Sequence, residues 1–188
     1  MNLTLNQIVS LAKLAYEPDY HKITNSLKAA FDVSDDDIKY IYVERTDTEA
    51  FIVRIEDLCV ISFSGTESMV DLKNDLFFVP SRYGKEAFVH AGFKKIAKQV
   101  KPLLMESLCE MYPIKNDHPS KILLTGHSLG GTISMMCCDH LYFSKFNEIE
   151  RKVVTFGCPN GWSKHAVEIF DRRTTNITNY INTFDYVS

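Results

Sequence analysis

The stretch Thr125–Gly131, with the sequence TGHSLGG, decides how this chain is expected to fold. A short apolar run beginning at Lys121, KILLTG, leads into it, and the small and apolar run LGGTISMMCCDHLYF follows it. The first run is typical of a buried strand and the second of a helix. Gly126, Ser128 and Gly130 form the pattern G-x-S-x-G, which places a nucleophilic serine on a tight strand-to-helix turn. The glycines suit such a turn, because the backbone around the serine is strained and closely packed.

An incidental serine in a glycine-rich turn would give the same pattern, and G-x-S-x-G is common by chance. The strand before Ser128 and the small-residue helix after it favour the nucleophile over this alternative. A helix beginning at Leu129 would also direct free backbone N–H groups at the site, where they stabilise a developing oxyanion.

The rest of the chain predicts an α/β fold. The segments IKYIYVERT and EAFIVRIE alternate as strands do and predict an N-terminal antiparallel hairpin. From about residue 57 onward, apolar strands alternate with helices, which favours a mostly parallel central sheet with helices on both faces. Active sites of such sheets lie beyond the carboxyl ends of the strands. Because no linker or repeat interrupts the pattern, we expect one domain spanning 1–188.

The composition narrows the partners and the compartment. The net charge is −3 and no basic stripe is present, which argues against a nucleic-acid partner. We find neither a signal peptide nor a run approaching the ~18 apolar residues of a membrane span. The five cysteines are odd in number, lie in apolar surroundings and lack metal-ligand spacing. Reduced thiols, a cytoplasmic location and no metal are therefore expected.

Five segments, taken in chain order, resemble the class 3 lipases, the fungal triacylglycerol lipase-like enzymes of the α/β-hydrolase fold. The segments are VISFSGTESMVDLKNDL, VHAGF, TGHSLGG, VVTFGCPNG and INTFDYV, and the resemblance covers roughly residues 40–188. It implies a serine ester hydrolase that cleaves acylglycerols, phospholipids or simpler carboxylic esters through an acyl-enzyme on Ser128. It implies no cofactor. Lipid or small-ester substrates, with transient contact to a membrane or lipid interface, are the partners that it implies.

The resemblance also implies roles for single residues. Thr66 and Leu129 would supply the two N–H groups of the oxyanion hole, and Asp185 would be the carboxylate of the catalytic triad. Asp75 would orient the Thr66 hydroxyl, although a solvated charge on a short helix explains Asp75 equally well. The segment 67–80 corresponds to a mobile lid in many relatives, and its apolar residues could face lipid or belong to the core.

The family's triad histidine follows the aspartate, and here no histidine follows Asp185. All six histidines precede it: His21, His90, His118, His127, His140 and His165. Only His165 has a geometric claim to be the base, and a surface position on a helix is favoured for it. Three explanations stay open: a truncated chain, a natural short form without a general base, or a base from elsewhere. We favour truncation, so that the C-terminal part of the fold is missing. The alternative function is a truncated or catalytically dead hydrolase-fold domain that binds a lipid or a protein.

Overall fold

The structure is a computed structural model of the 188-residue chain, and it describes residues 2–65, 79–113, 118–174 and 176–181. Three of the predicted site residues, Thr66, Asp75 and Asp185, lie outside the described residues. The predicted lid segment lies outside them as well, except for its last two residues, Val79 and Pro80.

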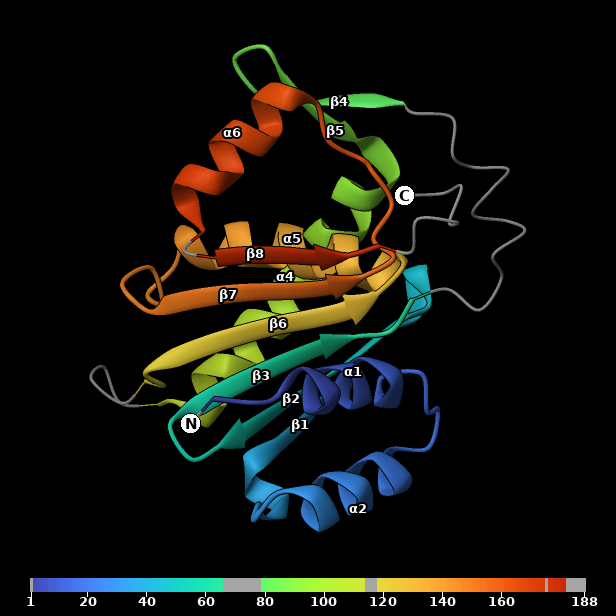
Figure 1. Ribbon diagram of the computed structural model, residues 1–188, viewed down its shortest axis with the longest axis vertical. Coiled ribbons are helices and arrows are strands. Elements are labelled where there is room, and N and C mark those ends of the chain that lie inside the picture. Colours follow the sequence, from blue (N-terminus) through green and yellow to red (C-terminus); the bar gives the residue numbers. More distant parts are fainter. Residues whose placement is uncertain (1, 66–78, 114–117, 175, 182–188) are drawn as a thin grey trace.

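A six-stranded sheet forms the centre of the molecule, in the order β1-β2-β3-β6-β7-β8 (Figure 1). The first three strands pair antiparallel, and β3, β6, β7 and β8 pair parallel. This arrangement confirms the predicted hairpin and the mostly parallel sheet. The strands are β1 (Ile38–Val43), β2 (Thr48–Ile55), β3 (Leu58–Phe63), β6 (Lys121–His127), β7 (Glu150–Phe156) and β8 (Asn176–Tyr180).

Helices cover both faces of this sheet, as predicted (Figure 1). The helices α1 (Leu5–Leu14) and α2 (Tyr20–Ala30) pack on one face, and α4 (Ala91–Met111) and α5 (Leu129–Tyr142) pack on the other. Successive residues of β3 point to opposite faces, so that Val60 joins the core under α1 and Ile61 joins the core under α4 and α5. Two short 3-10 turns, η1 (Asp35–Asp37) and η2 (Glu44–Thr46), flank β1.

A second, two-stranded sheet was not predicted as such. It pairs β4 (Pro80–Gly84) with β5 (Ala87–His90), and the helix α6 (Lys164–Arg173) packs against β5. The sequence PSRYGKEAFVH does not predict this hairpin, because proline, glycine and charged residues interrupt the alternation of apolar and polar residues that is typical of strands.

Pro102 predicts a kink or a break in the helix around it. The predicted break is wrong, because α4 continues as one helix through this residue. The helix buries Val100, Leu104 and Leu108 completely, on one side, while Pro102 is exposed. Packing of that apolar face therefore compensates for the backbone hydrogen bond that proline does not form.

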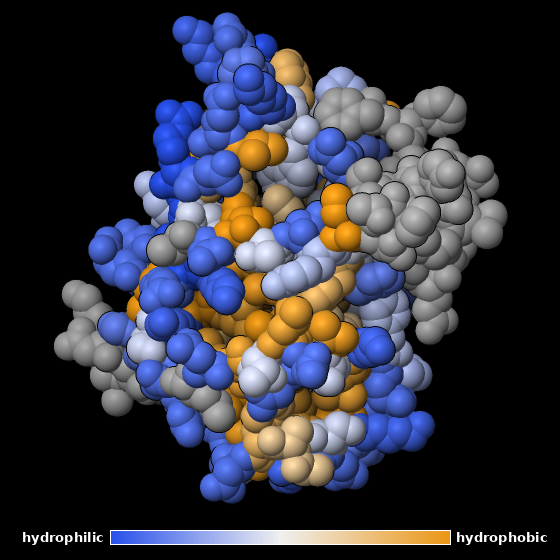
Figure 2. All heavy atoms as spheres, viewed as in Figure 1, coloured by the Kyte–Doolittle hydropathy of each residue, from blue (hydrophilic) through white to orange (hydrophobic). Residues whose placement is uncertain are grey.

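Hydrophilic residues lie mostly around the edges of the face shown in Figure 2, whereas hydrophobic residues gather at its centre. On this face α1 lies over β3 and β6, and the stacked rings of Phe156 and Tyr180 belong to the strands beside them. None of the helices in the described part of the chain is long and apolar enough to cross a membrane.

Candidate active site

Ser128 joins β6 to α5 through a strained turn. Its backbone has φ 53° and ψ −124°, a region that favours glycine and that residues with a Cβ rarely adopt. The turn is held from the neighbouring strand, because the Ser128 N–H donates to the Phe156 carbonyl at 2.9 Å. A non-glycine residue in this conformation costs of order 1–3 kcal/mol, and such strain collects at functional sites. The geometry therefore supports the interpretation of Ser128 as a nucleophile elbow.

The glycines on either side of Ser128 are required by space. A Cβ on Gly126 would lie 2.5 Å from the Gly130 carbonyl carbon. A Cβ on Gly130 would lie 2.7 Å from the Ser64 carbonyl oxygen and would also collide with the carbonyl of Phe63. Both obstacles are backbone atoms, which have little room to move. The G-x-S-x-G spacing thus lets the start of α5 pack directly against the end of β3.

The start of α5 offers backbone donors beside the nucleophile. The Gly131 and Thr132 N–H groups are used within the helix, since they donate to the Ser128 carbonyl at 3.0 and 3.4 Å. Leu129, the first residue of the helix, carries one of the N–H groups that have no acceptor within an α-helix. This position, next to a nucleophile and at the positive end of the helix dipole, suits an oxyanion donor.

The parallel strands deliver their following residues to the same edge of the sheet. Phe63, the last residue of β3, pairs with Gly126, and the chain then reaches Gly65. Tyr180, the last residue of β8, pairs with Phe156 beside the elbow. The described parts of β3 and β8 therefore end at the edge where Ser128 lies. The roles predicted for Thr66, Asp75, Leu129 and Asp185 stay predictions.

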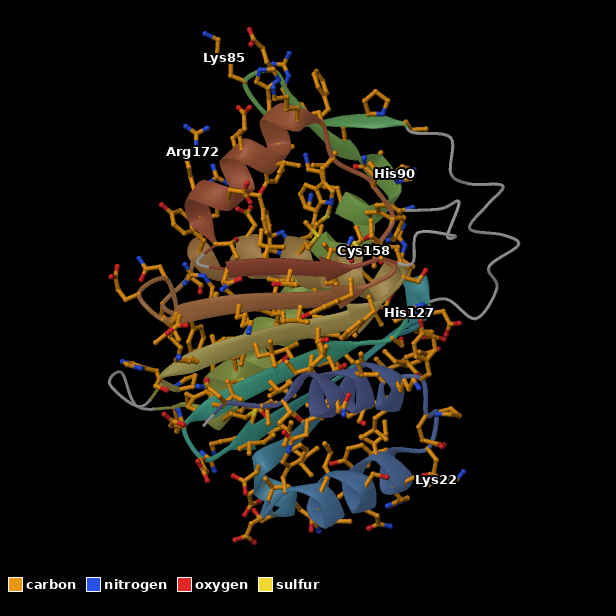
Figure 3. The ribbon with its side chains drawn as sticks, viewed as in Figure 1. Lys22, Lys85, His90, His127, Cys158 and Arg172 are labelled. Atoms are coloured by element: carbon orange, nitrogen blue, oxygen red, sulfur yellow. The ribbon has the colours of Figure 1, made fainter. Side chains whose placement is uncertain are left out.

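The loop after β7, which contains Cys158, lies at the same edge of the sheet (Figure 3). Its Cys158 thiol lies 3.3 Å from the Thr132 hydroxyl of α5, and burial raises the pKa of the thiol to about 11. A thiol of this pKa stays protonated at neutral pH and does not compete as a nucleophile. The Asn179 side chain holds the loop, since it accepts from the Thr155 hydroxyl at 3.0 Å and from the Cys158 N–H at 3.4 Å.

One contact of the elbow is not predicted by any pattern in the sequence. The hydroxyl of Tyr16, in the residues after α1, lies 2.8 Å from His127 Nδ1, directly before the nucleophile. Figure 3 shows His127 at the end of β6. No local pattern could have predicted a contact between residues separated by 111 positions.

The other histidines occupy different parts of the fold. His90 precedes α4 and its ring packs on that of Phe93, with ring centroids 4.3 Å apart and the planes tilted by 33°. His140 lies in the last turn of α5, where burial, with a smaller effect from Lys101, lowers its pKa to about 4. His165 is exposed on the first turn of α6, which lies away from the end of β6 in Figure 1. The remaining two are His21 on α2 and His118 before β6.

The fold and the elbow together define an α/β-hydrolase. The family model for lipase (class 3) matches residues 60–188, and the chain belongs to this family. The match leaves out α1, α2, β1 and β2, which lie before residue 60.

Known proteins resemble the chain over part of their lengths. It is 31% identical over 99 residues to phospholipase A1 PLIP1, chloroplastic, of Arabidopsis thaliana, a match that covers 50% of this chain and 15% of that protein. It is 33% identical over 115 residues to the lipase of Rhizomucor miehei, covering 57% of this chain and 31% of that protein. The chain thus spans less than a third of the length of either curated relative.

A solved structure agrees with the fold over a larger share. It is a triacylglycerol lipase whose catalytic centre is described as a serine protease triad, and it superposes with a TM-score of 0.74. Its sequence is 23% identical, and the superposition covers 95% of this chain and 71% of that chain. At this identity the likeness establishes the fold.

Proposed function

We propose that this protein is a serine ester hydrolase that cleaves lipid esters through an acyl-enzyme on Ser128. The observation that carries the proposal is the strained backbone of Ser128 between β6 and α5. A turn in this conformation directs a serine hydroxyl to the carboxyl edge of the sheet, where Ser128 is 5% exposed. Membership of the class 3 lipase family and the two similar lipid-cleaving enzymes support the same chemistry.

In the proposed reaction, Ser128 Oγ attacks the ester carbonyl and loses its proton to a general base. The N–H groups of Leu129 and Thr66 stabilise the oxyanion of the tetrahedral intermediate. The intermediate expels the alcohol, which takes up the proton, and leaves an acyl-enzyme. Water then attacks the acyl-enzyme and releases the fatty acid and the free serine. Asp185 would hold the base in the required tautomer and stabilise its charged form.

The substrates that we propose are acylglycerols, phospholipids or simpler carboxylic esters. Two exposed apolar residues at the ends of described segments, Val79 before β4 and Ile181 after β8, support transient contact with a lipid interface. Val79 is 58% exposed and Ile181 is 55% exposed. Moving apolar side chains of this exposure from water into contact with an acyl chain lowers the free energy.

Hydrolysis of a short-chain p-nitrophenyl ester tests this function, with Ser128→Ala as the control. We expect the unsubstituted chain to release p-nitrophenol at least ~10³-fold faster than Ser128→Ala. Equal rates would contradict the proposal for this chain and leave a truncated lipase or a binding domain, and restoring a longer C-terminus would decide between them. If the chain is active, single His→Gln substitutions at the six histidines identify a base within it. The substitution of the base removes most of the activity.

A cytoplasmic location is a separate proposal and rests on the cysteines. All five are free, and four of them are buried. Burial raises the pKa of the Cys59 thiol to about 12 and that of Cys138 to about 11. Free, buried thiols are typical of proteins from a reducing compartment. Fractionation of cells that produce the tagged protein tests the location, and recovery outside the cytoplasm would contradict it.

A further inference from the structure

The first helix reaches the nucleophile elbow through one hydroxyl group. Tyr16 follows α1 and its N–H donates to the Lys13 carbonyl at 3.1 Å, which continues the last turn of the helix. The Tyr16 hydroxyl lies 2.8 Å from His127 Nδ1 and 3.3 Å from the His127 carbonyl oxygen. A single side chain from the N-terminal layer thus contacts both the ring and the backbone of the residue before Ser128.

The helix that carries this contact, α1, is held firmly against the sheet. The Ser62 hydroxyl of β3 donates to the Leu11 carbonyl of α1 at 3.0 Å, and both groups are buried. Leu11, Ala12 and Ala15 are each only 2% exposed. Because α1 is fixed to the sheet in this way, the position of the Tyr16 hydroxyl is fixed by the fold rather than by a free loop.

The two short distances select one tautomer of His127. A tyrosine hydroxyl has one proton to donate, and its oxygen also accepts. If Nδ1 carries the imidazole proton, Nδ1–H donates to the hydroxyl oxygen, and the hydroxyl donates to the His127 carbonyl. If Nε2 carries the imidazole proton, the Tyr16 hydroxyl donates its single proton to Nδ1. The His127 carbonyl then receives no hydrogen bond from Tyr16. The Nδ1-protonated tautomer satisfies both bonds and is the one we assign.

The same hydroxyl lies against the end of β3. A Cβ on Gly65 would collide with the Tyr16 hydroxyl and would lie 2.8 Å from the His127 carbonyl oxygen. Gly65 directly precedes Thr66, and His127 directly precedes Ser128. The hydroxyl therefore lies where the two segments that would supply the oxyanion donor and the nucleophile come together.

We propose that Tyr16 is a positioning residue, which holds the nucleophile elbow in its strained conformation through His127. This inference rests on the proposed function, because it assigns Tyr16 to the same site. It extends that site to the N-terminal layer, which lies outside the residues 60–188 matched by the family model. In this role Tyr16 acts on the position of Ser128 through His127.

Steady-state kinetics of Tyr16→Phe test the effect on the reaction. The substitution keeps the ring and removes only the hydroxyl. We expect kcat to fall about 10- to 100-fold, with KM changed less than about twofold, because small displacements of a reacting group have effects of this size. Tyr20→Phe is the matched control, since the Tyr20 ring packs on Tyr40 of β1 and should leave kcat unchanged.

A double-mutant cycle tests whether Tyr16 acts through His127. If it does, Tyr16→Phe lowers kcat much less in a His127→Ala background than in the unsubstituted chain. Fully additive effects would contradict coupling through His127. Thermal unfolding of every variant is measured alongside, and kcat is expressed per folded molecule. A variant that lowers the melting temperature while this kcat stays unchanged would reduce Tyr16 to a stabilising role and overturn the proposal.

Nuclear magnetic resonance of the histidine nitrogens tests the contact without reference to activity. We expect His127 to carry its proton on Nδ1 in the unsubstituted chain and to shift toward the Nε2 tautomer in Tyr16→Phe. An Nε2 tautomer in the unsubstituted chain, or no change on substitution, would overturn the inference. If the unsubstituted chain does not hydrolyse esters, the proposed function fails, and this spectrum alone decides whether Tyr16 holds the elbow.

Discussion

Two serines occupy the same structural position in this fold and serve it differently. Ser163 precedes α6 with an ordinary extended backbone, φ −72° and ψ 156°, and its hydroxyl accepts from the Ala166 N–H at 3.3 Å. Ser128 precedes α5 with φ 53°, and its side chain makes no capping bond to the helix. Capping is the usual use of a serine at this position. Ser128 therefore does not serve as a helix cap, and its strained backbone needs another explanation, which a role as nucleophile supplies.

The helices that follow these two serines, α5 and α6, also differ in how much of each is buried. Nearly all of α5 is buried, whereas α6 buries only Ala166 and Phe170. The loop before α6 is relaxed, because its positive φ of 57° falls on Gly157. The comparison indicates that the unit β6–α5 is rigidly packed around its serine and that the unit β7–α6 is an ordinary crossover beside it.

The largest change in stability is expected from filling the space beneath the elbow. Gly130→Ala would push a methyl group against the backbone carbonyls of Phe63 and Ser64. We expect a loss of about 3 kcal/mol in the free energy of unfolding, measured by urea denaturation, because backbone must move to relieve the overlap.

Gly131→Ala is the matched control for this substitution. Its Cβ would lie 3.1 Å from side-chain carbons of Cys158 and Thr155, and no backbone atom lies as close to it. Alanine also has the higher helix propensity, by up to ~1 kcal/mol. A loss at Gly131 as large as that at Gly130 would show that the close packing is not specific to the elbow.

Acid is expected to weaken the β6–α5 unit through His140. The folded protein lowers the pKa of His140 from 6.5 to about 4 by burial, with a smaller effect from Lys101 and an opposing one from Asp139. Between these two values the unfolded chain binds a proton that the folded chain does not. The free energy of unfolding therefore falls as the pH drops from about 6.5 to 4, by about 3 kcal/mol from this group.

Urea denaturation across this pH range, with and without His140→Gln, measures that contribution. The substituted chain should lose less stability on acidification than the unsubstituted one. His165→Gln, which removes an exposed histidine on α6, is the control for the loss of an imidazole. Equal slopes for all three proteins would contradict a buried neutral His140.

A smaller loss is expected where serine acts as a cap. Ser163→Ala removes the bond to Ala166 and also a bond from the Phe88 N–H, which donates to the Ser163 hydroxyl at 3.0 Å. The expected cost is about 1–2 kcal/mol in the free energy of unfolding. Activity per folded molecule should not change. Loss of turnover in this variant would contradict a purely structural role for Ser163.

Replacing the strained serine by glycine is expected to have the smallest effect on stability and the opposite sign. Ser128→Gly relieves the unfavourable φ and should raise the free energy of unfolding by about 1 kcal/mol. Gly157→Ala, which places a Cβ at a positive φ, should lower it by a similar amount. Thermal unfolding shifts of the same sign for both variants would contradict the assignment of strain to Ser128.

The sequence alone predicted those parts of the molecule whose patterns are local. The alternation around β1 and β2 predicted the hairpin, and the apolar run before Gly126 predicted the buried strand that leads to Ser128. The glycine spacing predicted the turn itself, because the close approach of Gly126 to Gly130 lies within that turn.

Features that depend on distant packing were missed. The contact between Tyr16 and His127 joins segments 111 positions apart, and no spacing rule relates them. The continuous helix through Pro102 reflects burial of its apolar face, which outweighs a local preference. The positions of Thr66, Asp75 and Asp185 rest on the resemblance to the family, since they lie outside the described residues.

The most direct measurement of the central claim is covalent labelling by a fluorophosphonate, read by intact mass and by peptide mapping. The reagent reacts with activated serines and would add one phosphonyl group per chain. The account predicts stoichiometric labelling at Ser128 in the unsubstituted chain and in Ser163→Ala, and none in Ser128→Ala. An unlabelled chain, or a label that persists in Ser128→Ala, would contradict the claim that the strained serine is the nucleophile.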